Sequence, residues 1–314
     1  MPDDPVVAAR PTAPAAPLAH VTVCICTYRR PALLRQLLDA LAGQETDGAF
    51  THSIVVVDND AARSSEAVVL AFARSSTLPV RYDVEPRQNI ALARNLAVVH
   101  ATGQGLAFID DDECPPARWL WTLVDALRRS GADGVLGPVL PRFETCPPRW
   151  VVAGRFYERP RYPTGSVIAW RQGRTGNTLL RRAIFEPGAA PFNAEFVTGE
   201  DQDFFRRMIA RGHRFVWCEE AAVHEVVPPV RWRRTFMIRR ALLRGAVTPR
   251  HPTFGVRDVV TSLVAVPVYT ALLPLTLVLG QAAFMRYVVK LCDHLGRLLA
   301  LIHIRPVRDA YVTE

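Results

Sequence analysis

The N-terminal part of the chain alternates between short apolar runs and longer segments whose apolar positions have helical spacing. The apolar runs have the length of buried strands and lie at residues 21–26, 54–57, 80–84 and 106–109. Segments with apolar residues three and four positions apart lie at residues 31–41, 64–74, 89–101 and 119–129. The first pattern predicts strands and the second predicts amphipathic helices. Their alternation predicts an α/β domain with a mostly parallel central sheet and helices on both faces.

The pattern becomes less regular after this region. Residues 138–195 are rich in Pro, Gly and Arg, which predicts a part with long loops and short strands. Residues 200–211 predict a helix, with Gly212 at a position that commonly ends one. Two further apolar runs predict closing strands, at residues 215–218 and 221–226. We therefore expect a single α/β domain over residues 20–230.

The chain changes character beyond residue 230. A basic stretch comes first, with arginines at Arg231, Arg233, Arg234, Arg239, Arg240 and Arg244. Residues 259–285 then carry no charged side chain, a length above the about 20 apolar residues that cross a bilayer. The more amphipathic residues 287–304 follow. A basic segment beside an apolar one is typical of a cytoplasmic membrane face.

We therefore predict that residues 231–314 contain a helical hairpin that associates with the membrane, as a peripheral or anchored segment, through residues 256–304. The alternative is a hairpin that packs on the protein itself or on a second subunit. At the other end of the chain, residues 1–19 contain Pro, Ala and Asp without a basic, apolar leader. This composition predicts a disordered tail.

Composition narrows the functional classes. The formal charge is +8, from 38 Lys and Arg against 30 Asp and Glu. This basicity suits nucleic acid, an anionic membrane surface or a phosphorylated small molecule. The six cysteines lack C-x-x-C spacing, and Cys24 and Cys26 point to the same face of a predicted strand. We interpret them as core thiols of a protein in a reducing cytosol.

Polar clusters follow three of the predicted strands, at residues 27–30, 58–60 and 110–113. Ligands of open α/β sheets bind at the carboxyl ends of the strands, so the clusters predict a site at this edge. The last cluster contains four consecutive carboxylates, which repel one another and whose pKa values burial would raise. We expect a cation among them, and their oxygen atoms suit Mg²⁺ or Mn²⁺. The alternative is an acidic turn.

These clusters belong to a larger pattern, which comprises Asn95 and residues 21–30, 55–59, 110–112 and 199–204. In this order and spacing the chain resembles the family 2 glycosyltransferases, from residue 20 to residue 226. The resemblance implies a GT-A-like, nucleotide-sugar-binding sandwich and an inverting enzyme of the hexosyltransferase class. Within that family the chain resembles the bacterial exopolysaccharide glucosyltransferases of the succinoglycan type.

The resemblance implies roles for five residues in donor binding. Thr27, Tyr28 and Arg29 match the loop that holds the nucleotide. Asp58 matches the acid that accepts a hydrogen bond from the N3–H of uracil, and Arg94 is expected to contact the nucleotide. Structural alternatives are a half-buried core aromatic for Tyr28, an Asx turn for Asp58 and a solvated helix face for Arg94.

The resemblance also implies the metal ligands and the base. Asp110 and Asp112 match the first and last acids of the DxD motif, which hold Mg²⁺ or Mn²⁺ with the diphosphate. Asp201 matches the general base, which takes the proton of the acceptor hydroxyl. Acids at a helix start also cap it, which is the alternative for Asp201 and our interpretation of Asp203. His224 is expected as a further metal ligand or as a structural histidine.

Three more residues are expected near the sugars: Gly176 and Asn177, in a loop resembling the one that faces donor and acceptor, and Glu200, which precedes the base. The alternative for the loop is a plain turn. Processive members of the family carry a Gln-x-x-Arg-Trp signature. Residues 230–234 lack its glutamine, so we expect one sugar per reaction.

The expected function is metal-dependent transfer of one sugar from a UDP-sugar to a hydroxyl acceptor, with no nucleic-acid partner. The acceptor is expected to be a saccharide or lipid-linked saccharide of exopolysaccharide or cell-envelope glycan synthesis, at the cytoplasmic face of the inner membrane. One alternative is a sugar-phosphate nucleotidyltransferase, although residues 27–30 lack the glycine-rich loop of such enzymes. Another is a non-catalytic membrane or nucleic-acid adaptor, against which the acids at 58, 110, 112 and 201 argue.

Overall fold

A computed structural model of the chain describes residues 18–196, 198–251, 253–304 and 306–307. Most of the predicted tail, residues 1–17, lies outside the described residues. Leu18, which we placed in that tail, is buried in the core with 1% of its surface exposed. The folded part of the chain therefore begins earlier than the sequence indicated.

The chain forms two compact units. The sheet unit consists of the described residues of Met1–Leu140, Arg159–Ala194 and Glu200–Glu225, and the helical unit of those of Pro141–Glu158, Glu195–Gly199 and Val226–Glu314. The two units exchange segments along the chain, whereas we predicted one boundary near residue 230.

The sheet unit is built on a seven-stranded sheet with strand order β3-β2-β1-β4-β8-β6-β9. Its strands are β1 (His20–Thr27), β2 (Thr51–Asp58), β3 (Val80–Val84), β4 (Gly105–Asp110), β6 (Gly134–Leu136), β8 (Thr178–Arg181) and β9 (Phe215–Trp217). β8 pairs antiparallel with β4 and β6, and the other pairings are parallel. The predicted mostly parallel sheet is confirmed, and β3 lies at one edge of it.

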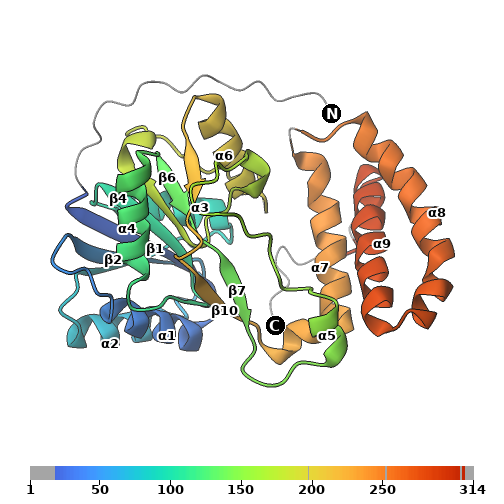
Figure 1. The fold of residues 1–314 in the computed structure, drawn as a ribbon, viewed down its shortest axis with the longest axis horizontal. Helices are drawn as coiled ribbons and strands as arrows, with labels where there is room; N and C mark the ends of the chain where they lie inside the picture. The colour runs from blue at the N-terminus through green and yellow to red at the C-terminus, as the bar shows by residue number, and fades with distance from the viewer. Residues whose placement is uncertain (1–17, 197, 252, 305, 308–314) are drawn as a thin grey trace. The chain divides into compact units, whose positions relative to one another are not determined.

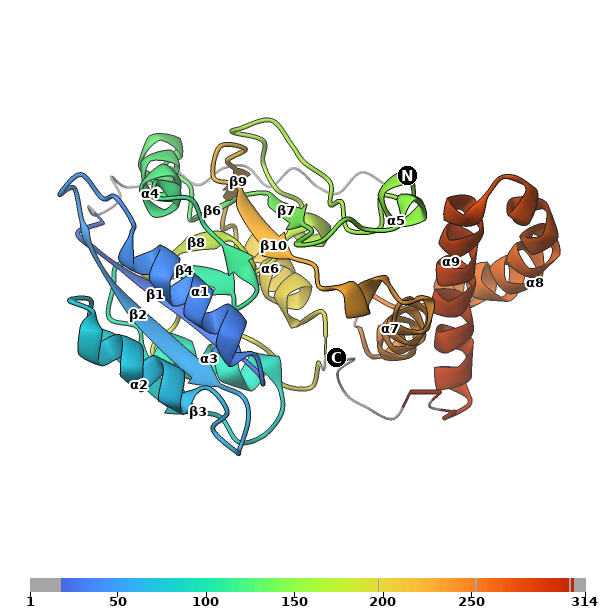
Figure 2. The same cartoon turned by 90° about the horizontal axis from the view of Figure 1, so that it is seen from below.

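Helices cover both faces of this sheet (Figure 2). They are α1 (Pro31–Ala42), α2 (Glu66–Ser75), α3 (Ile90–His100), α4 (Trp119–Ser130) and α6 (Glu200–Ala210). One core cluster joins β1 to α1, α2 and α4, and the other joins β1 to α3 and α6. On β1, Val23 and Ile25 belong to the first cluster and Cys24 to the second, since successive strand residues face opposite ways. Each fully buried aliphatic side chain contributes roughly 1.5–3 kcal/mol to folding.

A second, three-stranded sheet has the order β5-β10-β7. Its strands are β5 (Glu113–Cys114), β7 (Val139–Arg142) and β10 (Val223–Val226). β10 runs antiparallel to β5, so that Glu225 lies opposite Glu113. The sequence predicted a strand near β10 but not its partner β5, which has only two residues.

The helical unit contains α5 (Arg149–Ala153), α7 (Arg234–Val247), α8 (Val256–Val278) and α9 (Gln281–Leu301). Helix α9 packs against both α7 and α8 (Figure 1). The predicted hairpin is present, but its turn lies at Gly280 and not after residue 285. Gly280 has φ +99°, a backbone conformation that glycine adopts readily. The basic stretch, for which we predicted no secondary structure, forms most of α7.

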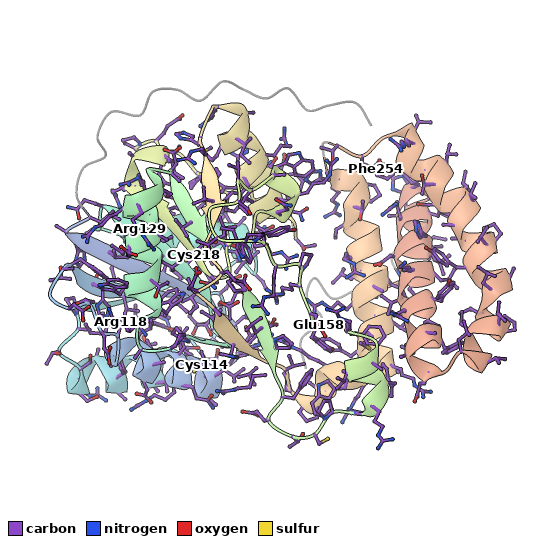
Figure 3. The ribbon with its side chains drawn as sticks, in the orientation of Figure 1. Cys114, Arg118, Arg129, Glu158, Cys218 and Phe254 are labelled. Carbon is purple, nitrogen blue, oxygen red and sulfur yellow. The ribbon has the colours of Figure 1, made fainter. Side chains whose placement is uncertain are left out.

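All six cysteines are free thiols. Cys24 is buried and Cys26 half-buried, on the same strand, and burial raises the pKa of both thiols, to about 12 for Cys26. Cys114 and Cys218 lie at separate places in Figure 3. These properties are those of structural thiols that remain protonated at neutral pH.

Candidate active site

Strand β4 carries the acidic cluster to the edge of the central sheet. Asp110 ends β4 with its side chain 46% exposed, whereas Asp111, Asp112 and Glu113 are buried. Glu113 turns back so that its Oε2 accepts a hydrogen bond from the backbone N–H of Asp110 at 3.1 Å. Its buried Oε1 has no hydrogen-bond partner among the described residues. Burial, with the charges of Asp110 and Asp112, raises the pKa of Glu113 well above its usual value.

The loop after β1 supplies a cation to the second half of this cluster. Arg30 Nη1 donates to Asp111 Oδ1 and to Asp112 Oδ2, both at 3.1 Å. Thr27 Oγ1 donates to Asp111 Oδ2 at 2.8 Å. Arg30 thus supplies one positive charge to the acids, although we had selected only its three predecessors as site residues, and the expected divalent cation stays a prediction. Asp111 turns toward this loop, and burial raises its pKa to about 6 despite the charge of Arg30.

Arg94 joins two motifs that are far apart in the sequence. It lies on α3 with 8% of its surface exposed. Its Nη1 donates to Oε1 of Glu200, the first residue of α6, and its Nη2 lies 3.7 Å from Oδ1 of Asp110. The predicted convergence of the Asp110 and Glu200 motifs is therefore present. The guanidinium of Arg94, which we expected to bind the nucleotide, is the group that connects them.

The first turn of α6 gives its three acids different environments. Glu200 is buried, and burial raises its pKa to about 7 even though Arg94 lowers it. Asp201 is partly exposed, and its Oδ1 accepts a hydrogen bond from the backbone N–H of Gln202 at 2.7 Å. Asp203 is buried and accepts hydrogen bonds from Arg206 and Arg207. Asp203 is thus structural, through ion pairs with Arg206 and Arg207 where we had interpreted helix capping, and Asp201 is the acid open to a ligand.

Two arginines that we did not select complete the charge pattern. Arg159 forms an ion pair with Glu225, and its charge lowers the pKa of Glu113. Burial and the charge of Arg159 lower the pKa of Arg174, although the charge of Asp201 acts in the opposite direction. Both come from the irregular part of the sequence, where no periodicity marked them. For Glu225, the alternation of inward-facing and outward-facing residues along β10 was the signal that could have indicated it.

His224 is not brought into this cluster. Its neighbour Glu225 is buried beside the acids, whereas His224 is exposed. Successive residues of a strand point to opposite faces, so His224 faces away from Asp110 and Asp112. This placement disagrees with the predicted role of His224 as a metal ligand.

Asp58 is fully buried, and its carboxylate accepts hydrogen bonds from groups of the protein itself. Oδ1 accepts from the backbone N–H of Asp60 at 3.1 Å, and Oδ2 accepts from the backbone N–H of Ser65 at 2.8 Å and from the hydroxyl of Tyr82 at 3.1 Å. The predicted contact of Asp58 with uracil disagrees with this placement. The alternative that we kept, a turn stabilised by the Asp58 side chain, matches it.

Gly176 lies against the acidic cluster, and its place near the sugars stays a prediction. A Cβ at Gly176 would come within 2.9 Å of both Asp110 Oδ2 and Glu113 Oε1. Asn177 is fully buried, accepts from Trp119 Nε1 at 2.7 Å, and donates to the carbonyls of Pro138 and Ala221. The side chain of Asn177 therefore anchors the loop, contrary to the expected sugar contact.

Of the remaining predicted residues Thr27 is buried, whereas Tyr28 and Arg29 form a partly exposed rim. The guanidinium of Arg29 lies 5.0 Å from the ring centroid of Tyr28, and Arg29 Nε donates to Asp60 at 3.0 Å. The Arg29 side chain is 62% exposed and its φ is +55°. Such a planar, cationic surface beside the acidic cluster is open to an aromatic ring and a phosphate.

The sequence matches known proteins along most of this unit. Residues 22–186 match the family described as Glycosyl transferase family 2. Over 229 residues the chain is 35% identical to the succinoglycan biosynthesis protein ExoM of Rhizobium meliloti (strain 1021), covering 72% of this chain and 73% of that protein. The chain belongs to the family 2 glycosyltransferases. This assignment sets aside the nucleotidyltransferase and adaptor alternatives.

More distant relatives agree on the fold. The glycosyltransferase AglE of Haloferax volcanii is 25% identical over 65% of this chain and 66% of its own. The mannosyltransferase PcManGT of Pyrobaculum calidifontis, solved with GDP-Man and Mn²⁺, has a TM-score of 0.54 at 20% identity, over 94% of this chain and 76% of that one. TarS 1–349 of S. aureus, solved with UDP, has a TM-score of 0.51 at 19% identity, over 70% of this chain and 63% of that fragment. The GT-A fold is confirmed.

A divalent cation fits the acidic cluster of this glycosyltransferase. In the part of the chain that the structure describes, no three His, Cys, Asp or Glu side chains are already arranged as a complete metal site. Among the described residues the buried Oε1 of Glu113 nevertheless has no hydrogen-bond partner, and it lies close to the exposed carboxylate of Asp110 around Gly176. Carboxylate oxygens that are free to accept a cation are suitable ligands for Mg²⁺ or Mn²⁺.

Proposed function

We propose that this glycosyltransferase transfers a single sugar from a UDP-sugar to a hydroxyl acceptor, with inversion at the anomeric carbon. The observation that carries the proposal is the bridge from Asp110 through Arg94 to Glu200. It draws the donor motif and the first turn of α6 together. Asp201, which follows Glu200, is then close to the same edge of the sheet with its carboxylate partly exposed.

The proposed reaction is one displacement. Asp201 takes the proton of the acceptor hydroxyl while that oxygen attacks the anomeric carbon from the side opposite the diphosphate. The bond between the anomeric carbon and the diphosphate oxygen breaks, and the nucleoside diphosphate leaves with the bonding electron pair. A single displacement inverts the configuration. Arg94 orients the first turn of α6 through Glu200, since a carboxylate in a buried ion pair cannot turn freely.

Asp110 and Asp112 are the residues that would hold Mg²⁺ or Mn²⁺, and such a cation neutralises the charge of the diphosphate leaving group. Arg30 donates a hydrogen bond to Asp112. Its positive charge would therefore also stabilise the negative charge of a donor held at Asp112. Tyr28 and Arg29 supply the rim for the nucleotide, and Thr27 supports it from below through its hydrogen bond to Asp111. The bound UDP of TarS and the bound GDP-Man and Mn²⁺ of PcManGT support a nucleotide-sugar donor with a divalent cation.

The proposed acceptor is a lipid-linked saccharide of exopolysaccharide or envelope-glycan synthesis. The 35% identity to a succinoglycan biosynthesis protein supports this class of product. Helix α8 is long and apolar enough to cross a membrane, and most of its apolar surface is exposed. We place the enzyme at the cytoplasmic face of the inner membrane, where activated sugars are available and the acceptor lipid resides.

The test is nucleotide release from UDP-sugars with and without Mn²⁺, using the wild-type protein and the Asp112→Ala variant. We expect release to need the cation and to fall at least tenfold in Asp112→Ala. Asp39→Ala, which removes an exposed aspartate from α1, is the matched control and should retain activity. Release that ignores both the cation and the Asp112 substitution contradicts the proposal.

A further inference from the structure

Helix α8 has the reverse of the usual amphipathic arrangement. Its two buried residues are polar, Ser262 and Thr276, and half-buried Tyr269 lies midway between them, at a spacing of seven. The outward face is aliphatic, with 47–84% of each side chain exposed at Val256, Val260, Leu263, Val264, Val268, Leu275, Leu277 and Val278. An apolar outer face with a polar inner stripe is suited to contact with lipid on one side and a polar interior on the other.

Tyr269, in the middle of that polar stripe, lines a cavity of about 300 Å³ within the helical unit. Helices α7, α8 and α9 all contribute to its lining. Its charged and aromatic lining residues are Arg244, Tyr269, Lys290, Asp293, His294 and Arg297. The volume is at the lower end of the range of ligand sites in proteins.

The lining carries an excess of positive charge. Asp293 is the acid of the lining, and both of its carboxylate oxygens accept hydrogen bonds from Arg244. Lys290 and Arg297 form no ion pair with a carboxylate among the described residues. Two cationic groups therefore face the cavity uncompensated, which favours an anion in it.

Hydrogen bonds hold Arg297 and His294 in place, but one donor of Arg297 lacks an acceptor among the described residues. Arg297 Nη1 donates to Ser262 Oγ at 3.1 Å, and His294 Nδ1 lies 3.1 Å from the same oxygen. The buried Nε of Arg297 has no hydrogen-bond partner among the described residues. A buried, unpaired donor is unfavourable, so an acceptor that reaches it would be stabilised. Burial and the charges of Arg297 and Lys290 also lower the pKa of His294.

Close helix packing fixes the position of these groups. A Cβ at Gly245 of α7 would come within 2.1 Å of the carbonyl oxygen of Asp293, and one at Gly296 of α9 within 2.3 Å of the carbonyl oxygen of Leu242. The two backbones therefore touch beside the cavity. The site is organised before any ligand arrives, which reduces the entropic cost of binding.

We propose that this cavity binds the phosphate or diphosphate group of a membrane lipid. The cationic lining recognises the phosphate, and the aliphatic face of α8 lies among the acyl or prenyl chains. A lipid is favoured over a free anion because the cationic cavity and the exposed apolar surface belong to the same three helices. The proposal rests on the proposed membrane association but not on sugar transfer.

The experiment measures binding of the full chain to three kinds of vesicle: phosphatidylcholine alone, phosphatidylcholine with phosphatidic acid, and phosphatidylcholine with a polyprenyl phosphate. The main variant is Lys290→Gln, an exposed lining residue whose loss does not disturb the packing. The matched control is Arg286→Gln, which removes one exposed charge from the same helix outside the cavity. Arg297→Gln is a second variant, with its fold checked by circular dichroism.

We expect the wild type to bind vesicles with either phosphate lipid at least tenfold more tightly than phosphatidylcholine alone. Lys290→Gln and Arg297→Gln should lose most of this preference, with Arg286→Gln retaining it. Whichever phosphate lipid binds more tightly identifies the source of the phosphate. Equal losses in all three variants would reduce the effect to general surface charge and overturn the proposal.

A competition arm separates a lipid from a free anion. If inorganic phosphate or pyrophosphate at low millimolar concentration displaces the protein from the vesicles, and binds as tightly in their absence, the ligand is a free anion and the lipid proposal is wrong. All of these measurements are made without a sugar donor. Failure of sugar transfer therefore leaves the binding result interpretable, and the reverse also holds.

Discussion

The guanidinium of Arg94 and the carboxylate of Glu200 form a buried ion pair between the middle of α3 and the first residue of α6. Both residues are more than nine-tenths buried. Nη2 of the same arginine lies 3.7 Å from Asp110 at the end of β4. Three elements of the sheet unit thus meet at one charged side chain, and none of the three charges is fully solvated.

Removal of one partner should be far more harmful than removal of both. Arg94→Met leaves Glu200 buried without its cation, so that the carboxylate must either stay charged or take up a proton, and we expect this to cost roughly 3–5 kcal/mol of unfolding free energy. The double variant Arg94→Met/Glu200→Gln should recover a large part of that loss. Urea unfolding of the two single variants and the double variant measures the coupling, and additive losses would show that the pair does not interact. Arg35→Met, which removes an exposed partner of Asp39, should change stability little.

The base assignment predicts a separation of binding from transfer. Asp201→Asn keeps the size of the side chain but removes its ability to accept a proton, so transfer should fall at least a hundredfold. Donor binding, measured by calorimetry with UDP-sugar and Mn²⁺, should change less than threefold because Asp201 is assigned to the acceptor hydroxyl and not to the nucleotide. Glu186→Gln is the control for loss of an exposed acid. Normal turnover by Asp201→Asn would show that another group is the base.

The architecture of the sheet unit could be predicted because local periodicity determines it. The apolar runs of β1, β2 and β4 and the leucine spacing of α1 identify their own elements. Once a strand is identified, the position of its last residue locates a cluster such as that of Asp110, and no knowledge of distant contacts is needed. β8 and β5 were not predicted, since their pairing depends on partners far away in the chain and their runs are too short to show a period.

The site was harder to predict at the level of single side chains. Asp58 and Asp110 both lie at the end of a buried strand. The carboxylate of Asp58 accepts hydrogen bonds from the backbone N–H groups of Asp60 and Ser65, whereas the carboxylate of Asp110 remains exposed. Only the tertiary structure decides which acid is satisfied internally. For His224 the local information was sufficient, because strand alternation places it on the face opposite Glu225.

Gly176 offers a test of the metal and donor site. A methyl group at this position would lie within 2.9 Å of Asp110 Oδ2 and Glu113 Oε1, so Gly176→Ala should push the carboxylates apart. We expect the affinity for Mn²⁺ and UDP together to fall about tenfold or more, with the melting temperature lowered only slightly. Gly43→Ala is the control, since a Cβ there meets only ordinary contacts at 3.7 Å. Unchanged Mn²⁺ affinity in Gly176→Ala would separate this glycine from the metal site.

Asp203 predicts a pH-dependent contribution to stability. Burial by itself raises the pKa of Asp203, but hydrogen bonds from Arg206 and Arg207 outweigh it and hold the pKa below its usual value. A lowered pKa stabilises the fold above the unfolded pKa of about 3.9 and loses this effect as the pH falls through the folded value. Asp203→Ala should therefore cost roughly 2 kcal/mol at pH 7 and progressively less below pH about 4. Chemical unfolding at several pH values measures the difference, and a constant difference would contradict this origin.

The apolar face of α8 predicts where the enzyme resides. Leu263 and Leu275 are each 57% exposed on that face, so a glutamate at either position would place a charge where lipid is proposed. Desolvation of an unpaired carboxylate is unfavourable, and we expect Leu263→Glu/Leu275→Glu to move the protein from the membrane fraction to the soluble fraction. Leu70→Glu, at a 45% exposed site on α2 of the sheet unit, should leave the distribution unchanged. If the double variant stays with the membrane and is correctly folded, α8 does not provide the attachment, and the basic residues of α7 become the surface to test.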